Sequence, residues 1–596
     1  MEGEKVGRLT TFSGFPFFHS SNLPLSETMS HPNIWPTQPR LTAQIKFSDG
    51  QVLEGILNST IEDFIKAGNF PADPQPMACL VNGQLRELTY HADRDLMVRV
   101  LTVADSDGMR VYRRSLSLLL VAAADELFPE AEINIEYGLN FGALYSEVEG
   151  RSPFVEAELN QLEARMHELV EADLPIHKER ISIKEAEKLF QARGADDKLR
   201  LLKARRKPYL TIYNLNGYRD YMYGYMVPST DYLKTFAVDA YSNGFVLRYP
   251  RSSKPDELQP SVEYPKLVNI FDEYGDWMTK LGIRDVGALN EVILGGKLME
   301  TILVAEALQE QRIAQIATLL ALVHPKVRLV LISGPSSSGK TTFSKRLAIQ
   351  LLAHGIHPMA LGLDDFIVER ASTPRDEEGD YDYESIYATD LELFNDTLLR
   401  LMRGEAVTLP HYNFFTGGRE QGETSSISNE HIILVEGIHG MNPALVPHIP
   451  PDTTFRIYVS ALTQLNLDRH NRIATTDTRL LRRIIRDAQS RGYTAKDTIS
   501  RWPKVRQGEY KWIFPYQEYA DVMFNSALAY ELAVIKPMAE SLLLQIEPGK
   551  PEHVEAKRLL SFLQWFEPCP PDLVPDNSLL REFIGGSILK DYKASI

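Results

Sequence analysis

At 596 residues, the chain is too long for a single hydrophobic core, and its length predicts about three or four domains. Its net charge of −16 argues against broad, nonspecific binding of nucleic acid, and no apolar run approaches the ~20 residues that cross a bilayer. Two cysteines cannot form a disulfide framework, and the first residues lack the basic and apolar segments of a secretory signal. We therefore expect a cytoplasmic protein that does not bind membranes.

The amino-terminal part of the chain begins with residues 1–38, which are rich in Pro, Ser and Asn and predict a flexible extension. Residues 41–47 and 51–56 alternate apolar and polar side chains around Asp49-Gly50, a pattern typical of a β-hairpin. Ser59 and Glu62 have the spacing of a capping box and predict a short helix. On this pattern, residues 39–104, called the N-terminal domain below, resemble the TGS domain, a small ubiquitin-like module of threonyl-tRNA synthetases.

The resemblance to threonyl-tRNA synthetases continues through residues 105–284, called the second region below. Residues 113–129 and 138–145 are similar to the second additional domain of that family, where one helix carries His-x-x-x-His for metal-dependent editing. The matching positions here are Arg114 and Leu118, and neither side chain can bind zinc as histidine does. The resemblance therefore implies an α+β scaffold without its metal ligands, and oligomerisation, regulation and substrate capping all remain open as its role.

Residues 334–341 fit the P-loop pattern G-x-x-x-x-G-K-[ST] between a β-rich apolar run and a run with helical spacing. In such a loop, backbone N–H groups hold a polyphosphate, Lys340 reaches the β- and γ-phosphates, and the Thr341 hydroxyl binds Mg²⁺. An ordinary Gly/Ser turn is less favoured, because the whole motif occurs in the right context. We expect ATP to bind at Gly334, Pro335, Ser336, Ser337, Ser338, Gly339, Lys340, Thr341 and Thr342.

Around this motif, β-rich runs alternate with amphipathic helical runs from residue 285 to residue 545, called the P-loop region below. The pattern predicts an α/β fold with a parallel sheet, preceded by the two smaller α+β units. Residues 546–596 form a C-terminal tail, to which the sequence assigns no chemistry. The predicted strands are 327–333, 358–363, 431–436, 454–459 and 521–525.

Two acidic positions follow predicted strands of this sheet, at the edge where open α/β sheets bind ligands. Asp364 is our candidate for the base that accepts a proton from a substrate hydroxyl, with Asp365 as the second choice. A solvated Asp pair is the alternative, and the P-loop one βαβ step upstream favours the base. Glu436 ends the strand 431–436 and is expected to hold Mg²⁺ beside Thr341, whereas capping of the next turn is the competing interpretation.

Basic residues also repeat along one predicted helix. Arg479, Arg483 and Arg486 share a face, with Arg482 alongside. Arginine forks match phosphate oxygens, so we expect a mobile lid over the phosphates. A solvated face paired locally with Asp487 is the alternative.

The order of these motifs resembles the uridine kinase and phosphoribulokinase family over residues 327–530. The resemblance implies that Asp364 is the base, that Asp382 binds ribose hydroxyls, and that Tyr412 stacks near the nucleobase. It also assigns substrate or phosphate contacts to Arg483 and Arg486. Two departures concern base recognition: Asn413 replaces an acid, and residues 416–419 lack the histidine of uridine kinases.

We therefore expect a uridine kinase-like enzyme that phosphorylates a nucleoside at the ribose 5′-hydroxyl with ATP and Mg²⁺, and the resemblance implies a homo-oligomer. A kinase for a sugar phosphate or pantothenate is an alternative, although the acidic residues 376–384 favour a neutral acceptor. A second alternative is an RNA-associated regulator that docks through the basic run 198–207, a run more typical of a solvated helix face. Such a regulator would bind RNA in a salt-dependent manner without phosphate transfer.

Overall fold

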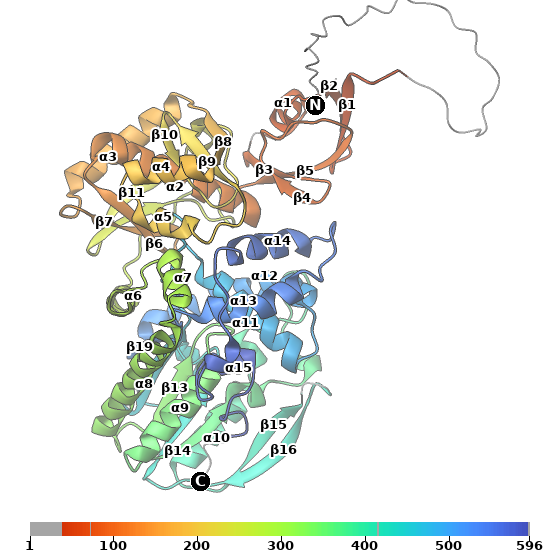
Figure 1. Ribbon diagram of the computed structural model, residues 1–596. Coiled ribbons are helices and arrows are strands. Elements are labelled where there is room, and N and C mark those ends of the chain that lie inside the picture. The colour runs from red at the N-terminus through yellow and green to blue at the C-terminus, as the bar shows by residue number, and fades with distance from the viewer. Residues whose placement is uncertain (1–37, 72, 414–415, 594–596) are drawn as a thin grey trace, which may run out of the picture.

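The computed structural model describes residues 38–71, 73–413 and 416–593, so the predicted extension lies outside the described residues except for its last one. The sheets of the second region and the parallel sheet of the P-loop region lie at opposite ends of the molecule (Figure 1). Between them lie the helices α6 (Pro265–Leu281), α7 (Val286–Leu294) and α14 (Glu552–Leu563). No helix in the described part of the chain is long and apolar enough to span a bilayer.

The N-terminal domain is a five-stranded sheet with the order β2-β1-β5-β3-β4, and the predicted hairpin and helix are both present. The helix α1 begins one residue later than the capping prediction, because Thr60 caps it and not Ser59. The Thr60 hydroxyl accepts the Asp63 N–H at 3.1 Å, and Asp63 accepts the Thr60 N–H at 2.8 Å. The elements are β1 (Thr42–Phe47), β2 (Val52–Ile56), α1 (Ile61–Ala67), β3 (Pro76–Val81), β4 (Gln84–Arg86) and β5 (Leu96–Thr102).

The second region packs two antiparallel sheets, with the orders β10-β9-β8 and β11-β12-β7-β6, against the long helix α2. Leu118 is fully buried in this core, and Arg114 donates to the Tyr225 carbonyl at 2.8 Å. Arg114 and Leu118, which align with the histidines of the synthetase family, therefore both contribute to the packed core of the second region. The elements are α2 (Ser106–Leu127), β6 (Glu132–Leu139), β7 (Ala143–Glu149), α3 (Glu156–Glu171), β8 (Ile176–Ser182), α4 (Ile183–Ala192), α5 (Asp196–Leu202), β9 (Tyr209–Leu215), β10 (Tyr218–Asp220), β11 (Ala237–Tyr241) and β12 (Gly244–Arg248).

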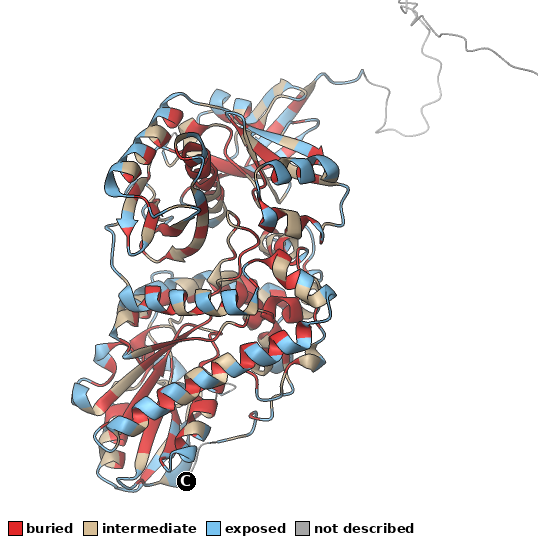
Figure 2. Cartoon of the chain, turned by 60° about the vertical axis from the view of Figure 1, so that its left-hand side comes forward, coloured by how far each residue is buried: buried red, intermediate tan, exposed pale blue. Residues whose placement is uncertain are grey.

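The P-loop region contains a five-stranded parallel sheet with the order β14-β17-β13-β18-β19. All five predicted strands are confirmed to within two residues, because strands buried on both faces appear in the sequence as apolar runs. They are β13 (Leu329–Ser333), β14 (His357–Gly362), β17 (His431–Glu436), β18 (Thr454–Ser460) and β19 (Val522–Asn525). Figure 2 shows buried residues along these strands and exposed residues on the outer faces of the helices.

Helices cover this sheet, and one hairpin projects from it (Figure 1). The helices are α6 (Pro265–Leu281), α7 (Val286–Leu294), α8 (Leu298–Val323), α9 (Lys340–Ala353), α10 (Leu391–Met402), α11 (Thr475–Ser490), α12 (Ala495–Trp512) and α13 (Glu531–Leu543). The hairpin consists of β15 (Val407–Asn413) and β16 (Gly418–Ser425).

The C-terminal tail packs onto the rest of the protein. It contains α14 (Glu552–Leu563) and α15 (Arg581–Ile584). Trp565 and Phe583 are buried in one apolar cluster with residues of α5, α11 and α13, so a single core joins the tail, the second region and the P-loop region. Burial of this apolar surface fixes where the tail meets the P-loop.

Charged groups hold the second region against the loop that precedes α11. Lys198 is 3% exposed and pairs with Asp468 at 2.9 Å and with Asp220 at 3.1 Å. Burial lowers the pKa of Lys198, but the two carboxylates outweigh that effect and hold it above its usual range. Nearby, Arg200 pairs with Asp285 at 2.6 Å and Lys203 with Glu291 at 2.6 Å. Three of the six basic residues in the run 198–207 are therefore paired with acids, and its first lysine is not a solvated docking group.

Candidate active site

The P-loop leaves β13 at Ser333 and enters α9 at Lys340. A Cβ at Gly334 would lie 1.9 Å from the Val459 carbonyl oxygen, so the neighbouring strand β18 requires glycine there. Gly339 has a φ of +86°, in the left-handed region that favours glycine. The two motif glycines thus let the loop close over the amino end of α9, where free N–H groups can bind phosphate oxygens.

Lys340, Thr341 and Glu436 come together at this end of the helix. The Thr341 hydroxyl donates to Glu436 Oε2 at 3.1 Å, and Lys340 Nζ lies 3.9 Å from Glu436 Oε1. Burial raises the pKa of Glu436, an effect that Lys340 opposes. A hydroxyl and a carboxylate that face each other are the hard oxygen ligands that Mg²⁺ prefers, so these residues fit the predicted metal.

The structure separates the two candidate bases. Asp365 accepts hydrogen bonds from His411 Nδ1 at 3.0 Å and from the Tyr412 N–H at 3.3 Å. Asp364 has no hydrogen bond or ion pair with any of the described residues, and its side chain is open to solvent. The protein atoms around it desolvate the carboxyl and raise its pKa, whereas the nearby charge of Lys340 lowers it. Asp364 is therefore the carboxylate left available to a substrate.

On the acceptor side, the sequence-predicted residues Asp382 and Tyr412 differ in accessibility. Asp382 is half-buried and accepts the Glu384 N–H at 3.2 Å. Tyr412 is only 4% exposed and lies near Tyr383 and Arg370, which leaves little ring surface for a nucleobase. The stacking role implied by the resemblance would need the β15–β16 hairpin to move.

Glu384 is a candidate residue that sequence reasoning missed. It is half-buried among Arg483, Asp382, Lys340 and Asp364, and burial raises its pKa to about 7. Glycine at position 508 makes room for it, because a Cβ there would lie 2.3 Å from the Cβ of Glu384. The only signal in the sequence was its place two residues after Asp382.

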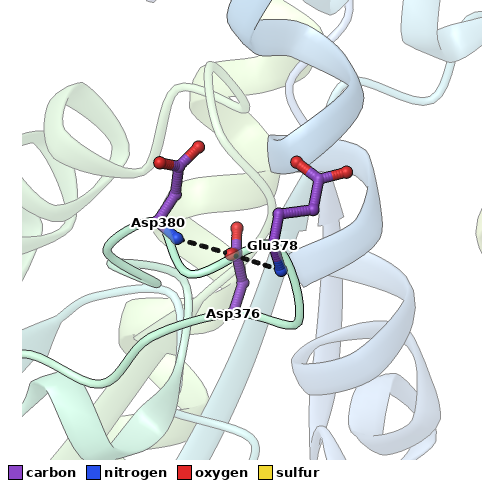
Figure 3. Close-up of side chains that lie close together, drawn as sticks. All are labelled: Asp376, Glu378 and Asp380. Atoms are coloured by element: carbon purple, nitrogen blue, oxygen red, sulfur yellow. Dashed lines mark hydrogen bonds between the residues drawn. The ribbon is translucent and has the colours of Figure 1, made fainter.

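The acidic loop 376–384 is less negative than its sequence suggests. Asp376, Glu378 and Asp380 lie close enough together to hold a cation. Figure 3 shows the Asp376 carboxylate accepting the N–H groups of Glu378 and Asp380, at 3.0 and 2.8 Å. Lys504 forms ion pairs with all three carboxylates, at 3.0 Å from Asp376 and 3.2 Å from Glu378. The ammonium group thus already provides the cation, and the loop is a weaker argument for a neutral acceptor than its composition implies.

The arginines of α11 divide into two pairs. Arg479 and Arg482 are 1% and 0% exposed and form ion pairs with Glu509 and Glu531, so for them the predicted surface lid is wrong. Arg479 also donates to the Ser336 carbonyl at 2.9 Å. Arg483 and Arg486 are half-buried, and Arg483 donates to the Ser336 hydroxyl at 2.9 Å. The helix thus fixes the P-loop through its buried arginine. The two arginines that remain for a ligand both pair with Asp487, at 3.3 and 3.7 Å, as the alternative interpretation expected.

Glu582, in the C-terminal tail, also reaches the P-loop. Its Oε2 accepts the Thr342 N–H at 3.2 Å and the Thr342 hydroxyl at 2.9 Å. Arg486 lies 3.9 Å away, and Leu579 of the same tail lies beside Gly339. A carboxylate therefore occupies an N–H group at the amino end of α9 that a nucleotide phosphate would use.

Residues 329–532 match the model of the Phosphoribulokinase / Uridine kinase family. This match confirms, for this part of the chain, the resemblance expected from its motifs.

The amino-terminal part of the chain resembles threonine–tRNA ligases. The one from Acidithiobacillus ferrooxidans is 32% identical over 206 residues, which are 34% of this chain and 31% of the ligase. The one from Symbiobacterium thermophilum is 29% identical over 32% of this chain and 30% of the ligase. The chain thus spans less than a third of the length of these curated relatives.

Among solved structures, a protein described as a "Possible Uridine Kinase" from Bacillus stearothermophilus is 24% identical to this chain. The match covers 36% of this chain and 98% of that protein, with a TM-score of 0.26.

Proposed function

We propose that the protein transfers the γ-phosphoryl group of ATP to the 5′-hydroxyl of a nucleoside. The observation that carries the proposal is the position of Asp364, an unpaired carboxylate whose charge acts on both Lys340 and Glu436 at the P-loop. Phosphoryl transfer to a hydroxyl needs such a carboxylate beside a phosphate cradle. The kinase family matched by residues 329–532 supports the same chemistry.

In this proposal each side chain has one task. Asp364 orients the acceptor hydroxyl and accepts its proton, and its raised pKa makes it a better base than a free aspartate. Lys340 and Arg483 stabilise the negative charge of the transferred group. Thr341 and Glu436 would hold Mg²⁺, which would supply positive charge beside the transferred phosphoryl group.

The nucleoside assignment depends on the carboxylates beyond the base. Asp382 and Glu384 present acceptor oxygens that suit the hydroxyls of a ribose, and Arg483 lies between them and the P-loop. A phosphorylated acceptor would suit these carboxylates less well, because like charges repel.

The test is ATP consumption against nucleosides, sugar phosphates and pantothenate, with Lys340→Ala and Asp364→Asn as inactive controls and Asp365→Asn as the matched control for charge. We expect one nucleoside to be phosphorylated, with activity lost in the first two variants and retained in the third. Turnover of a sugar phosphate or pantothenate alone would replace the nucleoside in the proposal. Salt-dependent RNA binding without any turnover would favour the regulator instead.

A further inference from the structure

Four arginines meet where the second region faces the P-loop region, and we call them the arginine cluster. Arg113 lies on α2, Arg251 follows β12, Arg472 precedes α11, and Arg506 lies on α12. Arg113 donates to the Tyr249 hydroxyl at 3.4 Å. The guanidinium groups of Arg251 and Arg506 lie 4.2 and 4.8 Å from the centre of the Tyr510 ring.

Arg472 joins these two pairs. Its guanidinium group covers Gly138, where a Cβ would lie 3.1 Å from Nη2, so the close approach requires glycine at that position. Burial lowers the pKa of Arg472, and the positive charge of Arg113 acts in the same direction. Burial raises the pKa of Tyr510, but the charges of Arg506, Arg251 and Arg113 outweigh it and lower that pKa overall. The four guanidinium groups therefore act on one small volume.

The carboxylates nearby are engaged elsewhere. Asp477 accepts two hydrogen bonds from Arg558, both at 2.7 Å, and Glu509 pairs with Arg479 as well as with Arg506. Arg113, Arg251 and Arg472 have no carboxylate within 4.0 Å among the described residues, and the buried Nε atoms of Arg113 and Arg472 have no hydrogen-bond partner there. Half-buried positive charges without counter-charges cost free energy, and the cost is unusual in a chain with a net charge of −16.

We propose that the arginine cluster binds the phosphoryl group of a small phosphorylated molecule. Guanidinium forks match phosphate oxygens in pairs, and three unpaired arginines supply enough donors for one dianion. Tyr510 is 37% exposed, so the site is open to solvent on that side, and its ring offers a surface for the rest of the ligand. The site is separate from the P-loop and does not depend on which acceptor the kinase uses.

A short series of contacts links the arginine cluster to the P-loop. Arg506 donates to Glu509, Glu509 pairs with the buried Arg479, and Arg479 donates to the Ser336 carbonyl. A ligand that drew Arg506 away from Glu509 would therefore change the ion pairing of Arg479, the residue that contacts the P-loop. Through Arg113 and Arg251, the second region would take part in binding this ligand.

The experiment uses the full chain carrying Lys340→Ala, which weakens the P-loop as a competing site for phosphates. Pyrophosphate is titrated into this protein by calorimetry, and Arg251→Gln, Arg472→Gln and Arg501→Gln are then added singly. Arg501 is an exposed residue of the same helix as Arg506 and serves as the matched control. We expect saturable binding of one pyrophosphate, weakened about tenfold or more by each of the first two substitutions and unchanged by the third.

Absence of saturable binding to the Lys340→Ala protein would overturn the proposal. It would also be overturned if Arg251→Gln and Arg472→Gln bound pyrophosphate as Arg501→Gln does. A short RNA that bound with the same arginine dependence, while pyrophosphate did not bind, would replace the small ligand with a nucleic acid. Thermal melting of each variant identifies a misfolded protein. Arg251→Gln is the substitution least expected to affect folding, because the Arg251 side chain makes no hydrogen bond among the described residues.

Discussion

The surroundings of Arg114 in the second region and of Asp364 in the P-loop region differ in whether their polar groups are paired within the protein. In the second region, Glu87 of the adjoining N-terminal domain accepts the Met226 N–H at 3.1 Å and pairs with Lys178 at 2.7 Å. Arg114 donates to a backbone carbonyl in the same core. In the P-loop region, Asp364 is left without a partner among the described residues, and Glu384 keeps a raised pKa.

The difference separates polar groups that stabilise the fold from polar groups that a ligand can reach. A buried polar group costs free energy unless it is hydrogen-bonded, so the pairing of these groups in the second region stabilises its fold. A working site keeps groups unpaired, because the substrate will supply the partners. Asp364 is exposed and has no protein partner among the described residues, so its carboxylate remains accessible to a substrate hydroxyl.

The largest expected effect comes from removing the base. Asp364→Asn should lower kcat by about 10²- to 10⁴-fold, because the amide cannot accept the hydroxyl proton. Arg114→Met in the second region should change kcat by less than about twofold. Steady-state kinetics with the nucleoside identified by the acceptor panel measures both. Equal losses in the two variants would show that the second region still takes part in catalysis.

The sequence alone predicted those features of the fold and the site that depend on a local pattern of residues. The five strands were found because parallel buried strands are continuous apolar runs, and the P-loop was found because its glycines and Lys340 are adjacent in the chain. The capping prediction failed by one residue because Ser59 and Thr60 both suit an N-cap, and only the backbone distinguishes them.

The parts that were missed depend on contacts between distant segments. Glu582 lies 240 residues after Thr342, and nothing in its local sequence indicates a phosphate site. The burial of Lys198 depends on acids at positions 220 and 468, so the basic run looked like a solvated face. The choice between Asp364 and Asp365 needed the hairpin that brings His411 to the second one.

The next largest effect tests whether the two regions form one cooperative unit. Lys198→Met should destabilise the protein by about 3–5 kcal/mol, because it leaves the buried carboxylates of Asp220 and Asp468 without a counter-charge. Urea unfolding followed by tryptophan fluorescence should show a lower midpoint. The matched control is Lys203→Met, since Lys203 is 66% exposed and its ion pair contributes little. A midpoint equal to that of the control would mean that the two regions unfold independently.

Removing the contact of the tail with the P-loop should have a smaller effect, and it should improve a property of the protein, its affinity for ATP. Glu582→Gln removes a negative charge from the N–H group that a phosphate would use, so ATP should bind about tenfold more tightly. Asp572→Asn, an exposed acid of the same tail, is the control and should leave binding unchanged. Fluorescence titration with a labelled ATP analogue measures the Kd of each protein. Weaker binding in Glu582→Gln would make Glu582 part of the nucleotide site and not a competitor for it.

The smallest effect concerns Glu384 and the pH dependence of stability. Its folded-state pKa is raised to about 7 by burial, whereas a free glutamate has a pKa of about 4.3. Between these values the folded state binds the proton that the unfolded state has lost, so the group's contribution to stability falls as pH rises from about 4.3 to 7. Glu384→Gln removes this titration, and the difference in urea midpoint between pH 5 and pH 8 should shrink. Glu378→Gln, at an exposed position, should leave that difference unchanged. If Glu384→Gln retained the full difference, Glu384 would be ionised throughout, and it would be paired with Arg483 instead of being held ready for a substrate hydroxyl.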